Sequence, residues 1–575
     1  MYKKRLFLFS AVFSVCSFGW SPAAAQTNPL AIPPTLEGPT YDLVMRDTSH
    51  VFFDGIQTAT AGFNGSFLGP TLIWNKGDDI QINVTNNLGE PTTVHWHGAH
   101  VSAENDGGPH SVIPDGTTWS PAFEVMNRAS TIWYHPHLHM FTNMHVYQGL
   151  AGMIIVRDDE EAALDLPREY GVDDFPIVLQ DRKFDVDGQL VFQPMGKGLV
   201  GDTYVINGTI DPILDAPGQV VRLRIVNGSS GRVYNVGMGD NRAMQQIASD
   251  GGLLEAPVAL TRIRLSPGER AEVLLDLASD IGDTLRVVNY ASELTNGERG
   301  GTFAASTPLD GVDSTLFFVG VSDALPGAVT SIPSNLTTIT PLLEADAVKT
   351  RPMIFNNNEL GQPFGINGIG LDLEVVNEVV NLNDTEIWEV GNETGDPHPF
   401  HIHMVTFQIL DRDGVAPPEN ERGWKDVVFV YPSEVVRLIT KFETFADPTG
   451  EFMYHCHILD HEDRGMMGQF VVVDNSTDAT EDTRPRTGEL LVRNYPNPFT
   501  DRTTIAYSMP SRSELKIEVF DVLGQRVKMV FDGVREQGDY ETIWKTGDAA
   551  AGVYFVRLTT PSQVVSHRVV LAGGE

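Results

Sequence analysis

The stretch from residue 455 to 467 reads HCHILDHEDRGMM, and it constrains the fold more than any other part of the chain. Successive side chains of an extended strand point to opposite faces. His455 and His457 therefore share one face of a strand, and Cys456 takes the other. One tripeptide can in this way supply ligands to two metal sites, one on each side of the backbone.

The chain has only two cysteines, and Cys16 lies in an N-terminal segment that we expect to be removed. Cys456 then has no partner for an intramolecular disulfide, and a lone thiol outside the cytoplasm oxidises unless something such as a metal holds it. One Cys, two His and a weak axial Met form the ligand set of a blue-copper electron-transfer site. His461 and Met466 follow at a spacing, past a turn expected at Gly465, that brings the chain back to the same metal. The alternative is a buried free Cys flanked by core histidines.

Length and charge limit the classes of protein that this chain can belong to. Its 575 residues are too many for one core and suggest about three or four domains. The net charge is −36, and it becomes −39 without the first 25 residues, which carry three basic residues and no acidic one. A strongly acidic surface argues against nucleic acid and anionic membranes as partners.

The N-terminus has the pattern of a secretory signal peptide at residues 1–25. Three basic residues precede an apolar stretch at 6–20, and small residues lead up to Ala25, after which we expect cleavage. The apolar stretch is short and interrupted by serine, which disfavours a membrane anchor. No later stretch is apolar enough to span a bilayer, so we expect no transmembrane segment and a protein that is secreted or held at the cell surface.

The rest of the chain is predicted to be all-β. Short runs rich in Val, Ile, Phe and Thr recur between turn residues, and several alternate with period two, as at 79–84 and 220–225. The predicted units are residues 27–160, 161–325 and 345–474, then a polar linker at 475–488 and a small β-sandwich at 489–575. Units one and three end in similar glycine-led apolar runs, each just after a histidine cluster, which indicates repeated sandwiches.

The 16 histidines are distributed unevenly, with none between His145 and His398. The middle unit therefore supplies no imidazole, and we expect the metal sites to lie between units one and three. Four His-x-His pairs would give eight same-face imidazoles, which suits a three-copper cluster: His95 and His97, His135 and His137, His401 and His403, His455 and His457. His398 favours the opposite face, with Cys456 and His461. A single pair of this kind is more often two core or surface histidines, but four pairs together with the Cys456 run favour metal binding.

These motifs resemble those of the three-domain multicopper oxidases, the family of laccases, cuprous oxidases and bacterial bilirubin oxidases. The likeness covers about residues 35–474 and implies three cupredoxin-like Greek-key β-sandwiches and four copper ions. By motif, His398, Cys456, His461 and axial Met466 are implied as ligands of the type 1 copper, and His95 and His401 as ligands of type 2. The type 3 pair is implied to bind His97, His135, His137, His403, His455 and His457.

The resemblance also implies a reaction. A reducing substrate gives one electron at a time to the type 1 copper, and four electrons reduce dioxygen to water at the other three. Asp106 and Glu462 lie beside ligand motifs and are implied as proton donors or relays. The alternative for both is a surface acid in an acid-rich protein.

The substrate is less well defined by the sequence. Cuprous oxidases of the copper-efflux branch usually carry a Met-rich insert before the third cluster, but residues 345–397 contain only Met353. We therefore expect laccase-like oxidation of phenols or aromatic amines. The alternatives are a cuprous or ferrous metallo-oxidase, in which Asp396 could contact the metal ion, and a non-catalytic copper-binding electron carrier. The carrier would leave the eight paired histidines unexplained.

The last unit carries NYPNPF at 494–499 and strand-like runs at 519–527 and 551–558. It resembles the type A sorting domain of the type IX secretion system, over about residues 488–575. This likeness implies the type IX secretion machinery as a partner and export across the outer membrane. An ordinary accessory β-sandwich is the alternative.

Overall fold

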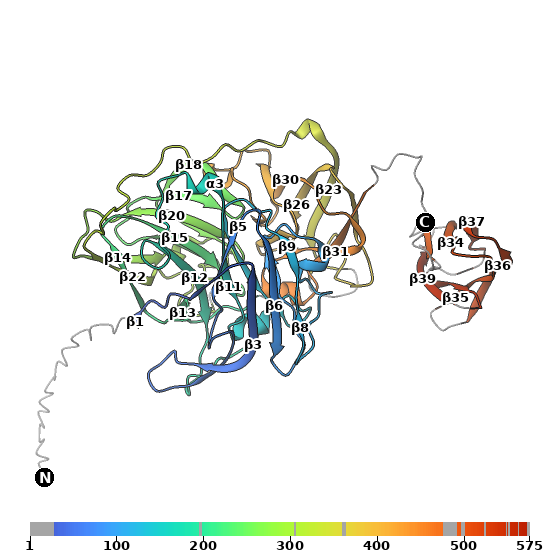
Figure 1. The fold of residues 1–575 in the computed structure, drawn as a ribbon, viewed down its shortest axis with the longest axis horizontal. Coiled ribbons are helices and arrows are strands. Elements are labelled where there is room, and N and C mark those ends of the chain that lie inside the picture. Colours follow the sequence, from blue (N-terminus) through green and yellow to red (C-terminus); the bar gives the residue numbers. More distant parts are fainter. Residues whose placement is uncertain are drawn as a thin grey trace, which may run out of the picture. The chain divides into compact units, whose positions relative to one another are not determined.

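The computed structural model describes residues 28–194, 198–303, 306–358 and 364–474, and most of 491–571. Within that last range the described residues are 491–495, 499, 501–521, 525–547, 549, 552–561 and 563–571. The predicted signal peptide and linker lie outside the described residues. The chain forms two compact units, Met1–Asn475 and Ser476–Glu575. Because strands dominate both, the prediction of an all-β chain is confirmed (Figure 1).

The first sandwich encloses a core that includes Leu43, Ile82, Trp96 and Ile154. One sheet has the order β2 (Thr35–Glu37), β5 (Thr71–Asn75), β11 (Gly152–Arg157), β10 (Ser130–His135), β7 (His95–His97). The other has the order β4 (Thr58–Phe63), β3 (Thr40–His50), β6 (Asp79–Asn87), β8 (Thr118–Trp119), and β9 (Ala122–Glu124) also pairs with β6. In β6, buried and more exposed residues alternate, as expected for a strand with one face on the core.

The second sandwich has two six-stranded sheets. The first has the order β1 (Asn28–Pro29), β14 (Pro212–Pro217), β22 (Ser314–Ser322), β21 (Thr284–Asn289), β16 (Tyr234–Met238), β19 (Ile263–Leu265). The second has the order β13 (Thr203–Ile206), β12 (Asp174–Arg182), β15 (Val220–Asn227), β20 (Arg270–Asp276), β17 (Met244–Ser249), β18 (Gly252–Leu260). Strand β1 precedes the first sandwich in sequence but pairs with β14 of the second, so residues 28–37 connect the two sandwiches.

The third sandwich holds the run at 455–467. One sheet has the order β24 (Gly365–Ile366), β23 (Ala347–Asn356), β26 (Thr385–Asn392), β30 (Val435–Lys441), β28 (Phe407–Arg412). The other has the order β25 (Glu378–Asn381), β32 (Met467–Val473), β31 (Asp447–Cys456), β27 (His398–Ile402), β29 (Val427–Val430). Their core includes Trp388, Phe400, Cys456 and Met466.

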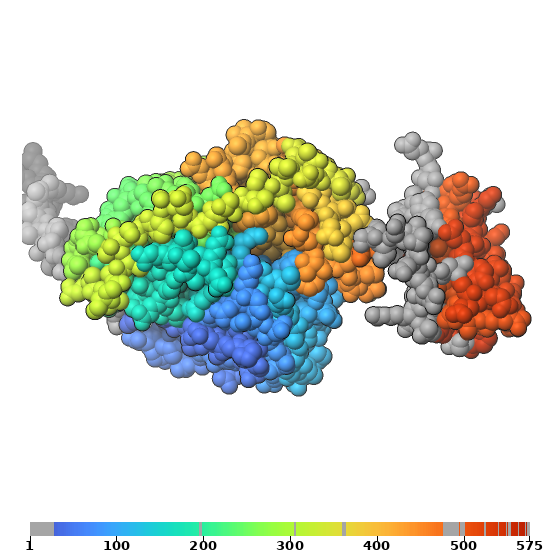
Figure 2. Space-filling view, turned by 45° about the horizontal axis from the view of Figure 1, so that its top comes forward, coloured from blue at the N-terminus to red at the C-terminus, as the bar shows by residue number. Residues whose placement is uncertain are grey.

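Short helices occupy connections between the strands. They are α1 (Ala103–Asp106), α2 (Thr142–Gln148), α3 (Asp159–Ala162), α4 (Leu459–Asp463), and the 3-10 turns η1 (Ala291–Glu293), η2 (Glu344–Asp346) and η3 (Glu419–Glu421). The connection between β22 and β23 runs along the surface as a yellow-green band (Figure 2). Leu336 of this connection packs on the second sandwich, and the amide of Leu342 donates a hydrogen bond to Gln408 of the third.

The C-terminal unit is a separate small sandwich with its own core, which includes Ile517, Trp544 and Val556. One sheet has the order β33 (Leu491–Tyr495), β34 (Arg502–Met509), β37 (Gly538–Lys545). The other has the order β36 (Arg526–Arg535), β35 (Ser513–Asp521), β38 (Gly552–Thr559), β39 (Val564–Leu571).

Candidate metal centres

The histidine pairs sit where strands of the first and third sandwiches end. In the first sandwich His95 on β7 lies opposite His135 on β10, and in the third His401 on β27 lies opposite His455 on β31. Only His95 and His97 lie on one strand throughout; in the other three pairs the second histidine comes just after the strand's end. Pro136 contributes to this difference, because it cannot donate to a strand ladder.

One group of imidazoles is centred on His97. Its Nδ1 lies 3.2 Å from Nε2 of His457 and 3.5 Å from Nε2 of His135. His97 and His135 come from the first sandwich and His457 from the third, so the group joins the two sandwiches.

A second group is centred on His455. Its Nε2 lies 3.1 Å from Nε2 of His137 and 3.3 Å from Nε2 of His403. This group likewise draws on both sandwiches, with His137 from the first and the other two from the third.

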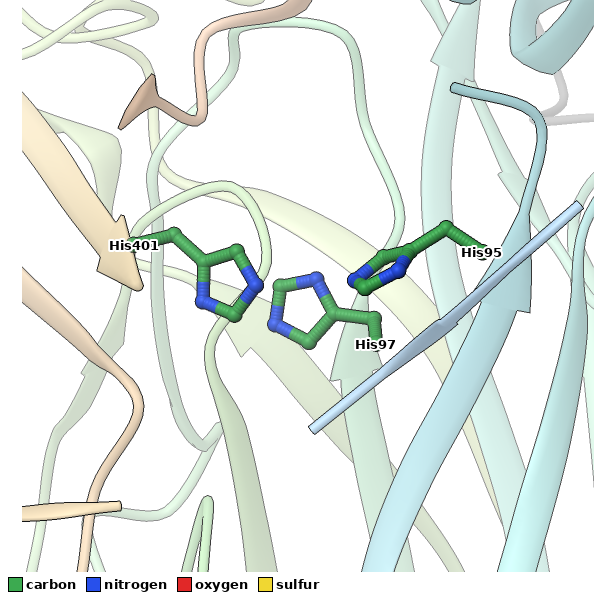
Figure 3. Close-up of side chains that lie close together, drawn as sticks. All are labelled: His95, His97 and His401. Carbon is green, nitrogen blue, oxygen red and sulfur yellow. The ribbon is translucent and has the colours of Figure 1, made fainter. Parts of the chain in front are cut away.

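His95 and His401 complete the set of eight. Nδ1 of each ring donates to a backbone carbonyl, that of Asp106 at 2.9 Å and that of Asp426 at 2.8 Å respectively. Their Nε2 atoms are buried without a hydrogen-bond partner. Figure 3 shows the two rings approaching each other from opposite strands, with His97 between them, and the ligand atoms of the three rings lie within 4.8 Å of one another.

Burial leaves these nitrogens free to bind a metal. Desolvation, with repulsion between neighbouring rings, holds the pKa far below its usual value in His97, His135, His137, His401, His403 and His457. Burial also lowers the pKa of His455 to about 3. The rings are therefore neutral at neutral pH, and a neutral imidazole has one nitrogen lone pair to donate. Converging lone pairs with no protein partner fit metal ions well.

A separate group lies on the other side of the Cys456 backbone. The thiol Sγ is 3.4 Å from Nδ1 of His398 and 3.6 Å from Nδ1 of His461, and the two Nδ1 atoms are 3.2 Å apart. Met466 is fully buried in the same core, and its carbonyl accepts the amide proton of Cys456 at 3.0 Å. Burial raises the pKa of the Cys456 thiol, so a bound cation is needed to keep it a thiolate.

The outer nitrogens of this group also have partners. Nε2 of His398 lies 2.7 Å from the Thr394 hydroxyl, and Nε2 of His461 lies 3.1 Å from Nη2 of Arg299. The ring of Phe364 stacks on the ring of His461 with their centroids 4.1 Å apart.

Asp106 and Glu462 are both buried, so neither is a surface acid. Asp106 Oδ2 accepts from Nδ1 of His403 at 2.7 Å. Glu462 lies 3.3 Å from Nδ1 of His455 and 3.5 Å from Nδ1 of His137. Burial holds the pKa of Glu462 well above its usual value, which favours the protonated form of its carboxyl group.

Sequence reasoning missed Asp426, Arg270 and Arg299. Asp426 contacts His97, and Arg270 of the second sandwich pairs with Asp426 through both carboxylate oxygens, at 2.5 and 2.6 Å. Asp426 is 329 residues from His97 in the chain, and Arg270 is 156 residues from Asp426. No local sequence motif marks Asp426, Arg270 or Arg299. The middle sandwich thus supplies no imidazole, as predicted. Its Arg270 reaches the His97 group through Asp426, and its Arg299 reaches the Cys456 group through His461.

Family models agree with this architecture. Models described as multicopper oxidase match residues 45–161, 180–306 and 344–476, and a model of the secretion system C-terminal sorting domain matches 493–572. A multicopper oxidase, Mco, of Staphylococcus haemolyticus is 36% identical over 442 residues, which cover 75% of this chain and 88% of the relative. The cell division protein FtsP of Photorhabdus laumondii is 33% identical, over 82% of this chain and 99% of its own.

Solved structures show the same fold. The laccase-like multi-copper oxidase CueO of Ochrobactrum sp., a lignin-degrading bacterium, has a TM-score of 0.71 at 36% identity and covers 77% of this chain and 100% of its own. A multicopper oxidase from Campylobacter jejuni, described as a metallo-oxidase, has a TM-score of 0.68 at 26% identity over 78% of this chain and 96% of its own.

Linked β-sandwiches that bury a Cys–His group beside paired imidazoles define a protein of the cupredoxin class. The chain belongs to the multicopper oxidase family, and its last unit is a secretion-system sorting domain, so both predicted resemblances are confirmed. Family membership implies copper, and the histidine groups are arranged so that they could hold metal ions. Among the described residues, no helix combines the length and the apolar character needed to cross a membrane.

Proposed function

We propose that the protein is a secreted, laccase-like multicopper oxidase. It would couple four one-electron oxidations of a phenol or aromatic amine to the reduction of one dioxygen molecule to water. The observation that carries the proposal is the placement of the tripeptide 455–457. Its cysteine belongs to the group with His398 and His461, and its two histidines belong to the imidazole groups on the opposite side of the backbone. The two sites are thereby joined through a few covalent bonds.

The proposed ligand sets come from the motif resemblance, and the convergence of histidine and cysteine donor atoms supports them. His398, Cys456, His461 and Met466 would hold the type 1 copper, and Nε2 of His95 and of His401 the type 2 copper. The two groups of three, centred on His97 and on His455, would hold the type 3 pair. Copper would supply one-electron acceptance at the thiolate and dioxygen reduction at the imidazoles.

Two buried acidic residues, Asp106 and Glu462, would orient the ligands and supply protons for the reduction of dioxygen. Asp106 holds Nδ1 of His403, so it orients that ring and lies beside the place where dioxygen would react. Glu462 lies against His137 and His455, and burial favours its protonated form, so it would be able to deliver a proton.

Metal content and spectra test this proposal. We expect four coppers per chain, a visible thiolate charge-transfer band, and separate type 1 and type 2 signals in the EPR spectrum. Cys456→Ser should remove the band and one copper and should abolish oxygen uptake with a phenol. A Cys456→Ser protein with unchanged turnover would refute the proposal. A copper-loaded wild-type protein that takes up no oxygen with any reductant would instead be an electron carrier.

A cuprous or ferrous metallo-oxidase is the second candidate function. It is favoured by Asp396, a carboxylate that is 39% exposed and lies two residues before His398. The Campylobacter jejuni neighbour, described as a metallo-oxidase, also favours it. Steady-state phenol oxidation with and without added Cu(II) separates the two functions. Weak phenol turnover that depends strongly on Cu(II) would favour the metallo-oxidase.

We further propose that the C-terminal unit directs export by the type IX secretion system. The match to the sorting-domain model and the separate core of this unit support the proposal. Fractionation of a host that has this system should place the oxidase outside the cell, and deletion of the unit should leave it in the periplasm.

A further inference from the structure

A cavity of about 200 Å³ lies where the three sandwiches meet. The first sandwich lines it with Arg128 and with residues that follow β11, the second with Leu253 of β18, and the third with Trp424. Residues 337–340, in the surface connection between β22 and β23, complete the wall (Figure 2). Among the described residues that line the cavity, none is a predicted copper ligand, so the cavity is separate from the metal groups.

The side chain of Arg128 is held in place on the cavity wall. Its guanidinium carbon lies 4.4 Å from the centre of the Trp424 ring, a cation–π arrangement. Gly252 packs against its aliphatic part, because a Cβ there would lie 3.0 Å from both Cγ and Cδ of Arg128. The Trp424 carbonyl accepts the amide proton of Gly251 at 2.8 Å, which fixes the backbone of Trp424 to the second sandwich. The positive charge therefore has a defined position.

The guanidinium of Arg128 has no acidic partner within the part of the chain that the structure describes. Its Nη1 is buried without a hydrogen-bond partner, and no described carboxylate forms an ion pair with it. Arg224, by contrast, contacts both Asp174 and Glu272. A half-buried charge without a partner costs stability, although a chain with 76 acidic and 40 basic residues has acids to spare. The site is therefore arranged for an acceptor from outside the chain.

Two acids line the cavity, but their oxygens are already engaged. Asp158 accepts the amide protons of Ala129 and Glu161, each at 2.8 Å, and Glu160 accepts the hydroxyl proton of Thr337. The cavity thus holds one unpaired cation and two nearby negative charges. Desolvation of an ion rises with the square of its charge, whereas its attraction to a single guanidinium rises only in proportion. These charges favour a monoanion over a dianion such as phosphate.

The remaining wall offers apolar surface from Leu253, Ile339 and the ring of Trp424. An apolar cavity of about 150 Å³ is large enough to hold benzene. The cavity of about 200 Å³ therefore has room for a body of that size together with a carboxylate group.

We propose that this cavity binds a small organic monocarboxylate, which pairs with the Arg128 guanidinium and packs its apolar body against Leu253, Ile339 and Trp424. The planar guanidinium matches the two oxygens of a carboxylate. Because the wall is built from all three sandwiches, an occupant that binds only the folded chain stabilises their packing. This binding goes beyond the proposed oxidase function and does not depend on it.

The test titrates benzoate into the copper-loaded full chain, by calorimetry and by its effect on the unfolding temperature. We expect saturation at one equivalent per chain and a higher unfolding temperature. Benzamide, which is neutral, and inorganic phosphate should bind at least about tenfold more weakly, as should benzoate to Arg128→Gln, because a charge-assisted hydrogen bond is lost. Arg168→Gln is the matched control, since Arg168 is 41% exposed, contacts Glu161 and does not line the cavity.

A second variant blocks the cavity without removing the charge. Thr338 is exposed at the cavity wall, so Thr338→Trp should fill the space and abolish benzoate binding while the copper content and visible band stay as in wild type. If Arg128→Gln does not fold, Thr338→Trp decides the outcome. The proposal is overturned if wild type does not bind benzoate, or if either folded variant binds it as tightly as wild type. Equal affinity for benzamide or phosphate would overturn the monocarboxylate class.

Discussion

Asp426 accepts a hydrogen bond at 3.2 Å from Nε2 of His97, the ring whose Nδ1 lies at the centre of one imidazole group. Arg270 fixes that carboxylate from the second sandwich through both oxygens. The contact determines which nitrogen of His97 carries the proton and which is free for a metal. A sandwich without imidazole ligands thus helps to set the geometry of the site.

Asp426→Asn should weaken copper binding at the imidazole groups about ten- to a hundredfold, because it loosens the orientation of His97 and leaves Arg270 poorly paired. The thiolate band should persist, since Asp426 contacts His97 of the imidazole group and not the Cys456 group. Copper content and EPR spectra measure both effects. Asp250→Asn is the control, because Asp250 is buried in the same ion-pair network and bonds to the Arg270 amide but touches no imidazole. Equal copper loss in both variants would contradict a specific role for Asp426.

Met466 rather than Met467 is expected to be the axial ligand. Met466→Leu should shift the midpoint potential of the thiolate site, because the axial ligand tunes it, and should keep the visible band. Met467→Leu should change neither, because Met467 on β32 pairs with His455 on β31 rather than with Cys456. Redox titration of both variants is the measurement, and a shift seen only in Met467→Leu would reverse the assignment.

Glu462→Gln should slow oxygen reduction by about a hundredfold or more, the usual contribution of a general acid, with copper content unchanged. Burial raises the pKa of Glu462 and favours its protonated form, whereas a glutamine of nearly the same shape cannot release a proton. Oxygen-uptake rates in H2O and D2O measure the effect. Asp460→Asn is the control, since Asp460 is buried on the same helix and pairs with Arg464. The role of Glu462 is refuted if Glu462→Gln and Asp460→Asn take up oxygen at the same rate.

Stability in acid should depend on Glu272, which is buried between Arg222 and Arg224. Burial opposes its ionisation, but the two guanidinium groups outweigh it and lower the pKa to about 2 from 4.5. A lowered pKa contributes stability that is complete above pH 4.5 and is lost as the pH falls towards 2, by about 3 kcal/mol in total. Urea unfolding of wild type and Glu272→Gln between pH 7 and pH 3 tests this. The variant should be less stable at pH 7, and the difference should narrow in acid.

The C-terminal unit should be dispensable for catalysis. A chain ending at residue 474 keeps the three sandwiches and every predicted ligand, and the removed unit has a separate core. We expect the same copper content, midpoint potential and unfolding temperature as in the full chain. Calorimetry and redox titration measure these, and a fall of several degrees in unfolding temperature would show that the units stabilise each other.

The sequence by itself determined the class of fold, and it predicted which residues bind metal. Alternation along a strand is a local rule, so it separated His455 and His457 from Cys456, and the histidine-free stretch excluded the middle sandwich as a source of imidazoles. The motif likeness divided the predicted ligands into sets before their positions were known, since the motifs are short and local.

Only the tertiary structure decided which nitrogen of each ring faces its neighbours and which groups surround them. Glu462 and Asp106 are buried against imidazoles, although an acid-rich sequence offers no sign of burial. Asp426, Arg270 and Arg299 reach the sites from distant parts of the chain, and their effect depends on distances of about 3 Å that packing sets. Local sequence rules carry no information on such contacts, because residues far apart in the chain meet only when the sandwiches pack together.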